Sequence, residues 1–281
     1  MNAQTIKHLA QTCGFSLCGI AKAEPLTAEK EWFEKALTQN FHDGKAYLER
    51  DVEKRFNPEM LLEGCKSVVV CGFNYFTGNR RGVTCYAPND KNYAPNDNNH
   101  VQNPNFKIAR YAQVEDYHIF MREKLEMLAQ CLQEQYGNFI YKTTVDSSAI
   151  SEKAWAVRAG IGYYGKNGII QTSLGSFIFL GILLINKEVD QYDNPNTKTC
   201  GNCNKCITAC PTQAIVNPYY VDCNQCISHI NLNKKETDFW RISQYGWIQG
   251  CDICQEVCPN NLRAQVNADA AAIKKNIFLR P

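Results

Sequence analysis

One run of cysteines constrains this chain more than any other feature of its sequence. It reads Cys200-Gly-Asn-Cys203-Asn-Lys-Cys206-Ile-Thr-Ala-Cys210-Pro211, with the spacing C-x2-C-x2-C-x3-C-P. Three thiolates at such short gaps can hold one iron–sulfur cluster, and the fourth cysteine of a run of this kind normally ligates a different cluster. The proline ends the helical turn before it, because proline has no N–H with which to continue the turn. The run therefore predicts a small electron-transfer module.

A second set of cysteines repeats this pattern further along the chain. It consists of Cys226, Cys251, Cys254 and Cys258, and a proline follows the last of them. Two such sets predict two 4Fe–4S clusters that exchange their fourth ligands. We assign to one cluster Cys200, Cys203, Cys206 and Cys258, and to the other Cys210, Cys226, Cys251 and Cys254. A zinc site or disulfides are the alternatives, but zinc ligands normally come in separated pairs rather than in interlocked runs that end in Cys-Pro.

The composition favours a globular protein in a reducing compartment. The chain has 281 residues and is 44% hydrophobic, which suffices for one large domain and one small domain. Its longest apolar stretch, Phe177 to Ile185, is far too short to cross a membrane, and the N-terminus lacks the apolar region of a signal peptide. Eight of the fifteen cysteines have cluster spacing, so we expect a cytoplasmic protein with no membrane partner. The net charge of +2 neither indicates nor excludes a nucleic-acid partner.

Helices and strands alternate before residue 186. The patterns predict helices over 6–13, 28–39, 47–55, 117–136 and 152–159, and strands over 15–21, 66–75, 140–145, 168–172 and 176–185. Thr27, Asp116 and Ser151 precede three of these helices, where capping residues are expected, and Gly137 closes the longest. The alternation favours an α+β fold, in which a large domain of α/β type is followed by a small ferredoxin-like domain with two 4Fe–4S clusters.

The domain boundaries follow from composition. We expect a catalytic domain over 1–190, a cluster domain over 191–262 and a tail over 263–281, with a polar linker at 186–199. Residues 77–105 are rich in Asn, Asp, Pro and Gly and contain Tyr-Ala-Pro-Asn-Asp twice, so they are expected to form a loop, either a lid or a plain surface loop. An electron-transfer module attached to a large domain implies redox chemistry in that domain.

Asp146 is the candidate acid of the large domain. It follows a predicted strand, at the kind of strand end where catalytic groups are commonly presented. A partly desolvated carboxyl group has a raised pKa and can act as a general acid. An aspartate that caps a turn or the next helix is an equally good interpretation of the sequence alone.

Two short motifs resemble cofactor-binding signatures, but each lacks a feature that its signature requires. Gly160-Ile-Gly162-Tyr-Tyr-Gly165 fits G-x-G-x-x-G, but a helix precedes it and a strand follows, the reverse of the dinucleotide-binding order. Its glycines are expected to let the backbone turn sharply or pass close to a flat cofactor. Asp116-Tyr-His118 begins like the D-x-H-x-x-G signature of base-off cobalamin proteins, but Met121 stands where the glycine belongs. We therefore expect a hydrogen-bonding histidine at a helix start and no cobalt ligand.

The chain as a whole resembles the epoxyqueuosine reductase family. Five blocks and the cysteine module carry the resemblance, and they follow the family's order over about residues 1–260. The blocks are Arg55-Phe-Asn-Pro with Lys66-Ser-Val-Val-Val, Ile108-Ala-Arg-Tyr111 with Asp116-Tyr-His118, Val145-Asp-Ser147, Ala156-Val-Arg-Ala-Gly-Ile-Gly162 with Gly165-Lys-Asn167, and Gly175-Ser-Phe-Ile-Phe-Leu-Gly181.

The resemblance implies a cobalamin-dependent oxidoreductase, related to reductive dehalogenases, that reduces epoxyqueuosine to queuosine at the wobble position of tRNA. It implies base-off cobalamin without a protein side chain on cobalt, two 4Fe–4S clusters, an external low-potential electron donor, and Asp146 as the proton donor. We expect a monomer. The candidates for holding the cofactor or the RNA backbone are Arg55, Arg110, Tyr111, His118, Ser147, Arg158, Gly160, Gly162, Gly165, Lys166 and Asn167.

Three departures from the family pattern affect these expectations. Members often continue into a C-terminal helical-repeat extension that helps to hold tRNA, whereas this sequence ends at Pro281. We expect a short form whose tRNA contacts come from the catalytic domain, with Lys274 and Lys275 as candidates from the tail. The usual Cys-Pro-Trp-Asn is replaced by Cys258-Pro-Asn-Asn, and Cys223 is an extra cysteine that competes with Cys226 as a ligand.

Two other functions fit the same modules. One is a cobalamin-dependent reductase of a small molecule, similar to a reductive dehalogenase. The other is a non-catalytic iron–sulfur electron carrier with a docking domain, which would contain no corrinoid.

Overall fold

The protein is described from a computed structural model. The described residues are 1–78, 83–85, 106–114, 116–146, 148–216, 219–232, 245–271 and 273. Both copies of the repeated pentapeptide, Ser147, Lys274 and Lys275 lie outside them, so the predictions made for these residues have no structural counterpart here. Within the described ranges, no helix has the length and hydrophobicity needed to span a membrane.

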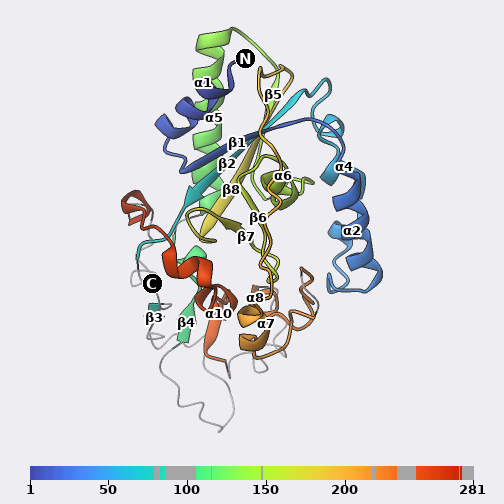
Figure 1. The fold of residues 1–281 in the computed structure, drawn as a ribbon, viewed down its shortest axis with the longest axis vertical. Coiled ribbons are helices and arrows are strands. Elements are labelled where there is room, and N and C mark those ends of the chain that lie inside the picture. Colours follow the sequence, from blue (N-terminus) through green and yellow to red (C-terminus); the bar gives the residue numbers. More distant parts are fainter. Residues whose placement is uncertain are drawn as a thin grey trace, which may run out of the picture.

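A four-stranded sheet forms the centre of the large N-terminal part (Figure 1). Its strands are β1 (Leu17–Lys22), β2 (Ser67–Asn74), β8 (Ile178–Ile185) and β5 (Tyr141–Thr144), in that spatial order. Every neighbouring pair is antiparallel. The α+β class is therefore confirmed. The sheet itself departs from a parallel α/β arrangement because its strands pair antiparallel, and β8, from late in the sequence, lies between β2 and β5.

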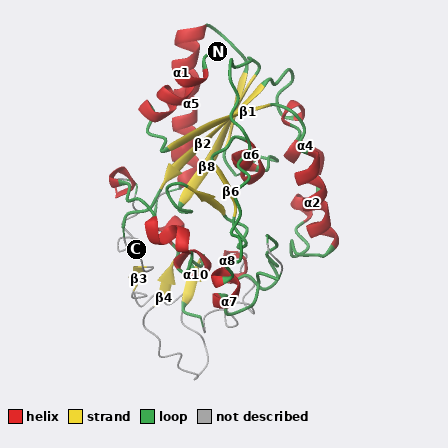
Figure 2. Ribbon diagram, in the orientation of Figure 1, coloured by secondary structure: helices red, strands yellow, loops and turns green. Residues whose placement is uncertain are grey.

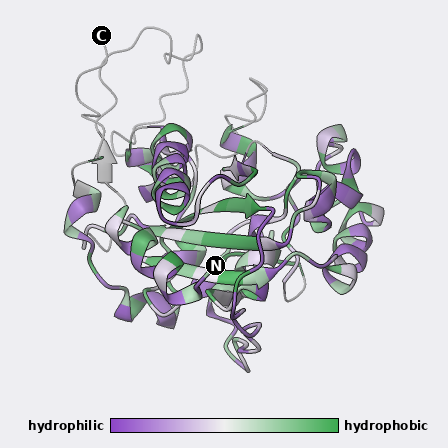
Figure 3. Ribbon diagram, turned by 90° about the horizontal axis from the view of Figure 1, so that it is seen from above, coloured by the Kyte–Doolittle hydropathy of each residue, from purple (hydrophilic) through white to green (hydrophobic). Residues whose placement is uncertain are grey.

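Helices cover both faces of this sheet (Figure 2). On one face lie α1 (Ala3–Thr12) and α5 (Tyr117–Tyr136), and on the other lies α6 (Glu152–Arg158). Successive residues of a strand point to opposite faces. Val69 therefore packs with the α1 and α5 side, and Val68 with the α6 side. The strands of the sheet stand out as hydrophobic in the view from above (Figure 3), as expected for a layer that is buried on both faces.

Short elements lead away from this core. They are α2 (Thr27–Thr38), α3 (Ala46–Glu49), α4 (Val52–Phe56) and the 3-10 turns Pro58–Met60 and Arg110–Gln113. A small hairpin pairs β6 (Gly162–Tyr164) with β7 (Ile170–Thr172). Thr27 is the first residue of α2 rather than its cap, since Leu26 occupies that position without a side-chain hydrogen bond. Asp116 caps α5 as predicted, and its side chain accepts a hydrogen bond from the N–H of His118.

The cysteine-rich part is built from short turns and helices at the lower end of Figure 1. Its elements are α7 (Lys205–Ala209), α8 (Ile227–Leu232), β9 (Trp247–Gln249), α10 (Ile253–Glu256) and the 3-10 turns Pro259–Arg263 and Ala268–Ala271. A second sheet, of order β3 (Val83–Cys85), β4 (Phe106–Ile108) and β9, crosses the predicted domain boundary. The two parts are therefore joined by backbone hydrogen bonds as well as by the linker.

The segment after the last cysteine also packs against the large part. Asn260 donates to the carbonyl of Thr172 at 3.1 Å, and Asn261 accepts from the N–H of Ser176 at 2.7 Å. Further on, Asn267 donates its amide side chain to the carbonyl of Asn74 at 2.7 Å. The asparagines that follow Cys258 thus attach the cysteine-rich part to the edge of the fold.

Candidate active site

Asp146 lies at the end of β5 with its carboxylate open to solvent. Its backbone is left-handed, with φ of +50°, a conformation that aspartate tolerates better than most residues. The side chain is 62% exposed. Its Oδ2 accepts a hydrogen bond from the Tyr117 hydroxyl at 3.1 Å and lies 3.2 Å from Nε2 of His118. Among the described residues, the side chain contacts Tyr117 and His118, so it faces the start of α5.

Asp116 and His118 extend this contact into an Asp–His–Asp array. Oδ1 of Asp116 lies 2.7 Å from Nδ1 of His118, so the imidazole has a carboxylate at each nitrogen. Burial disfavours the imidazolium, but the hydrogen bonds to the two carboxylates outweigh burial, and the pKa of His118 is raised. The Tyr117 ring stacks on the His118 ring at 4.0 Å and on Phe179 at 4.3 Å. His118 can therefore hold a proton and pass it to the Asp146 carboxylate.

Glu152 supplies a second carboxyl group next to Asp146. Its Oε1 accepts the backbone N–H of Asp146 at 2.6 Å. Burial, and then the negative charge of Asp146, raise the pKa of Glu152 to about 8. Glu152 is therefore largely protonated at neutral pH, while it also fixes the backbone turn that presents the Asp146 side chain.

Lys153 stands between Asp146 and the cysteines. Its ammonium donates to the carbonyl of Gly168 at 2.9 Å and interacts electrostatically with Asp146, Cys223 and Cys226. The residue has an exposed surface, yet the surrounding protein lowers the pKa of its ammonium. These two observations agree if the side chain is open to solvent on one side and enclosed on the others. One cation thus faces both the candidate acid and a candidate cluster ligand.

The cysteines gather in two sets. Cys206 and Cys258 interact electrostatically with each other and with Cys200, and Cys258 also with Cys203. We call Cys200, Cys203, Cys206 and Cys258 the outer set. Cys226 and Cys251 interact with each other and with Cys210, and Cys254 interacts with both of them.

We call Cys210, Cys226, Cys251 and Cys254 the inner set. Cys254 also interacts with Cys206, which brings the two sets next to each other.

Within the described ranges, no three metal-binding side chains stand close enough to share one ion. A 4Fe–4S cluster places each thiolate on an iron of its own, so the donor set fits two clusters by its composition. Burial raises the pKa of the Cys251 thiol to about 12, and only a strong positive charge such as iron would keep it as a thiolate.

The glycine-rich turn at 160–165 makes its close contacts with protein. A side chain at Gly160, where φ is +73°, would meet the Asn194 carbonyl at 2.8 Å. One at Gly162 would meet the Gln171 carbonyl at 2.5 Å, and one at Gly165 the Asn167 side chain at 2.6 Å. These glycines are therefore explained by tight packing, and their assignment to a cofactor stays a prediction.

Lys166 and Asn167 point towards the cysteines. Lys166 is buried and donates to the side chain of Asn204 at 2.8 Å, between two cysteines of the outer set. Asn167 hydrogen-bonds the thiol of Cys254. The turn therefore seats the cysteine-rich part on the large part and places a fixed positive charge near the outer set.

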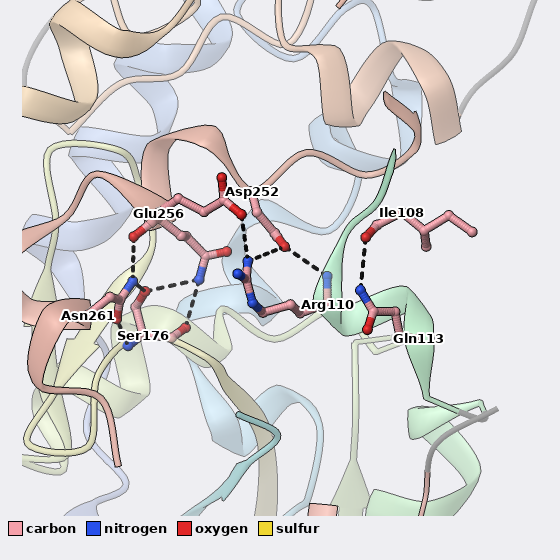
Figure 4. Close-up of polar contacts among 8 residues, drawn as sticks. Ile108, Arg110, Gln113, Ser176, Asp252, Glu256 and Asn261 are labelled. Carbon is pink, nitrogen blue, oxygen red and sulfur yellow. Dashed lines mark hydrogen bonds and ion pairs between the residues drawn. The ribbon is translucent and has the colours of Figure 1, made fainter. Parts of the chain in front are cut away.

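Arg110 and Tyr111 lie where the two parts of the molecule join. The guanidinium of Arg110 contacts Asp252 at 2.8 Å and Glu256 at 3.1 Å (Figure 4). Burial and the nearby charge of Asp252 raise the pKa of Tyr111 to about 12, and its hydroxyl lies within electrostatic range of Cys226.

Arg55 and Arg158 have different surroundings. Arg55 donates to the carbonyl of Tyr47 at 2.7 Å, and its Nε is buried without a hydrogen-bond partner among the described residues. Arg158 forms a surface ion pair with Glu24 at 3.4 Å. The Nε–H of Arg55 is thus available to a ligand, whereas the Arg158 guanidinium is used in a surface ion pair.

Four residues at this site were not singled out by sequence reasoning: Tyr117, Glu152, Lys153 and Asp252. Tyr117 sits inside the Asp-Tyr-His motif, and Asp252 is a charge inside the second cysteine motif, so both carried a local signal. Glu152 and Lys153 look like ordinary first-turn residues of a helix, and only the fold shows their proximity to Asp146.

An antiparallel α+β domain that presents an Asp–His–Asp array beside a double set of cysteines defines an iron–sulfur oxidoreductase. Two family models match the chain. The model described as "Epoxyqueuosine reductase QueG, DUF1730" matches residues 55–147, and the "4Fe-4S double cluster binding domain" matches residues 199–261. The iron–sulfur interpretation of the cysteine runs is therefore confirmed at the level of the module.

Similarity extends over nearly the whole chain. An epoxyqueuosine reductase of Cyclobacterium marinum is 39% identical over 264 residues, which cover 92% of this chain and 79% of that protein. A crystal structure of an epoxyqueuosine reductase with an epoxyqueuosine-modified tRNA-Tyr stem loop matches 96% of this chain and 70% of that one, with 28% identity and a TM-score of 0.78. The chain belongs to the epoxyqueuosine reductase family.

A more distant likeness concerns the fold alone. A reductive dehalogenase whose structure suggests a mechanism for B12-dependent dehalogenation matches 96% of this chain and 33% of that one, with 12% identity and a TM-score of 0.51. The fold of this chain thus also occurs outside this family.

Proposed function

We propose that this protein reduces epoxyqueuosine to queuosine at the wobble position of tRNA. The observation that carries the proposal is the position of Asp146. Its carboxylate lies next to the His118 imidazole on one side, and on the other side Lys153 lies between it and the inner cysteine set. Membership of the epoxyqueuosine reductase family supplies the substrate class. We propose further that the enzyme acts as a monomer and receives electrons from an external low-potential donor.

The reaction has a defined balance. Conversion of an epoxide into an alkene consumes two electrons and two protons and releases one water molecule. Iron–sulfur clusters pass electrons one at a time, so two clusters in series suit the electron supply. Asp146 would donate the proton that the opened epoxide oxygen needs, since its side chain is held in a fixed turn, is accessible to a substrate and lies within reach of His118, which can return a proton to it.

His118 and Glu152 would keep Asp146 supplied with protons. His118 Nε2 is 3.2 Å from the carboxylate, and Asp116 on the other nitrogen favours the imidazolium. Glu152 fixes the backbone of Asp146 and holds a second proton nearby. This arrangement allows both protons of the reaction to come from groups of the chain.

The residues around Lys153 fit a bound cobalamin. Cobalamin would supply the nucleophilic or radical centre that attacks the epoxide carbon. Arg55, Tyr111 and Lys153 would hold it, because Arg55 Nε is buried without a hydrogen-bond partner among the described residues, Tyr111 lies near Cys226, and Lys153 is open to solvent between Asp146 and Cys226. His118 is engaged by two carboxylates, which agrees with cobalt lacking a protein ligand.

The test is nucleoside analysis of tRNA from a strain that lacks this gene. Epoxyqueuosine is expected to accumulate there, and a plasmid with the wild-type gene is expected to restore queuosine. A plasmid with Asp146→Asn should restore little or none. Normal queuosine in the deletion strain would refute the proposed substrate. A visible spectrum without corrinoid after anaerobic reconstitution with cobalamin would favour the electron-carrier alternative.

A further inference from the structure

A shallow hollow lies on the surface of the cysteine-rich part. It has a volume of about 490 Å³, and its walls come from α7 and from the residue before Cys258. The lining residues are Asn204, Lys205, Thr208, Ala209 and Val257. Methyl and methylene groups form much of this lining, and Lys205 supplies one charge. In Figure 1, α7 lies at the end of the molecule opposite to the N-terminus.

The hollow sits on the segments that carry the outer cysteine set. Asn204 and Lys205 lie between Cys203 and Cys206 in the sequence, and Val257 directly precedes Cys258. These cysteines are half-buried. A cluster held by the outer set would therefore lie close to the hollow, since the residues that line the hollow are sequence neighbours of its ligands.

The order of the two sets defines a direction for electrons. The outer set meets the inner set at Cys206 and Cys254. The inner set in turn meets Lys153 through Cys226, and Lys153 faces Asp146. With a cluster in each set, an electron that enters at the hollow would pass through the outer set and then the inner set on its way to the Asp146 site.

The charged side chains on the stretch that carries α7 are positive. From residue 194 to residue 221 the only charged side chains are Lys198 and Lys205, and both are exposed. The acidic residues that border this stretch are Asp193, which pairs with Lys7 at 2.6 Å, and Asp222, while Glu256, next to Val257, pairs with Arg110 at 3.1 Å. A partner that docks here therefore meets Lys205 in the lining and Lys198 on the same stretch, which favours an acidic protein surface.

We propose that the hollow is the docking site of an acidic electron-carrier protein, an iron–sulfur or flavin protein of low potential. The proposal rests on the proposed function, because it names the donor of that reaction. In each encounter the carrier loses one electron and the outer cluster gains it, so two encounters supply one turnover, and no proton moves at this surface. An RNA partner fits less well, since its modified base must reach Asp146 on the side of the inner set.

The test measures cluster reduction rather than turnover. Anaerobically reconstituted holoprotein is mixed with a reduced bacterial ferredoxin, and the bleaching of the clusters is followed by stopped-flow spectroscopy. A Lys198→Glu/Lys205→Glu variant is expected to be reduced about tenfold more slowly than wild type at low ionic strength, and the difference should shrink at high salt because steering by charge is screened. Reduction by dithionite, a small molecule, should be unchanged.

Lys187→Glu is the matched control. Lys187 is exposed and lies beside Glu188, whose carbonyl accepts the N-terminal ammonium, at the opposite end of the molecule from α7. The control should react with ferredoxin at the wild-type rate. If the double variant loses iron, the ferredoxin rate is measured on Lys198→Glu alone, because Lys198 lies outside the cysteine runs.

Several results would overturn the proposal. One is a wild-type ferredoxin rate in the double variant at low salt. Another is a loss of affinity for a tRNA stem loop without a change in the ferredoxin rate, which would assign the lysines to RNA. A third is wild-type protein that neither ferredoxin nor flavodoxin reduces. A deletion strain with normal queuosine would instead refute the proposed substrate and leave these rates interpretable.

Discussion

Arg110 and Asp252 form a buried ion pair that joins the large part of the molecule to the cysteine-rich part (Figure 4). Nη1 of Arg110 lies 2.8 Å from Oδ2 of Asp252, and the same oxygen accepts the Arg110 backbone N–H at 2.9 Å. The two side chains are only 7% and 1% exposed. Asp252 directly follows Cys251, so the pair couples the position of an inner-set cysteine to the strand β4 that precedes Arg110.

Breaking this pair on one side should destabilise the protein strongly. Arg110→Met leaves Asp252 buried without its main partner, and the loss of one partner of a buried pair costs about 3–5 kcal/mol. Chemical unfolding of the holoprotein under anaerobic conditions measures this. Arg158→Met is the control, because its ion pair with Glu24 is exposed and worth about 0–1 kcal/mol. Equal losses in the two variants would contradict the role given to Arg110.

Asp146→Asn tests the general acid. An amide keeps the size of the side chain but cannot donate a carboxyl proton, so the rate of epoxide reduction should fall about 10²- to 10⁴-fold. The electron paramagnetic resonance of the clusters should match wild type, since the described contacts of the Asp146 side chain are with Tyr117 and His118 and not with a cysteine. A variant with full activity would exclude Asp146 as the proton donor.

Asp116→Asn tests the source of protons for Asp146. Hydrogen bonds to Asp116 and Asp146 raise the pKa of His118, so the folded state favours the imidazolium. This stabilisation is fully present below the ordinary pKa of histidine and is lost as the pH rises through the raised value. Removal of the Asp116 charge should move the alkaline limb of the kcat profile to lower pH.

The matched variant is His118→Gln, which removes the titrating group. It should lose that limb of the profile altogether and lower kcat across the range. A kcat profile of Asp116→Asn that coincides with wild type would show that His118 does not feed Asp146.

Features that depend on local sequence patterns could be predicted from the sequence alone. The cap at Asp116, the end of α5 at Gly137 and the cysteine spacing each depend on residues that are close along the chain. The hydrogen-bond and ion-pair partners of Arg110 and Lys166 could not be predicted from such local patterns. Each contacts a residue of the cysteine-rich part, and such contacts depend on how that part packs rather than on local periodicity. The insertion of β8 between β2 and β5 is of the same kind.

Glu152→Gln should change how stability depends on pH. Burial, and then the charge of Asp146, raise the pKa of Glu152 to about 8, well above the 4.5 of a free glutamate. Its stabilising contribution is therefore fully present below about pH 4.5 and is lost as the pH rises through about 8. Glutamine cannot ionise, so the free energy of unfolding of this variant should fall less over that interval. Glu31→Gln, on the exposed side of α2, is the control and should follow wild type.

Single cysteine variants test whether the two clusters exchange ligands. Cys210 belongs to the first run of the sequence but lies with the inner set, and Cys258 belongs to the second run but lies with the outer set. Cys258→Ser should therefore damage the outer cluster, and with it reduction by ferredoxin, while the inner cluster remains. Cys210→Ser should damage the inner cluster and leave an outer cluster that ferredoxin still reduces but that no longer supports turnover. Iron analysis and electron paramagnetic resonance of the two variants distinguish the cases, and Cys13→Ser, a buried cysteine of the large part, is the control. The reverse assignment would follow if Cys210→Ser, and not Cys258→Ser, abolished reduction by ferredoxin.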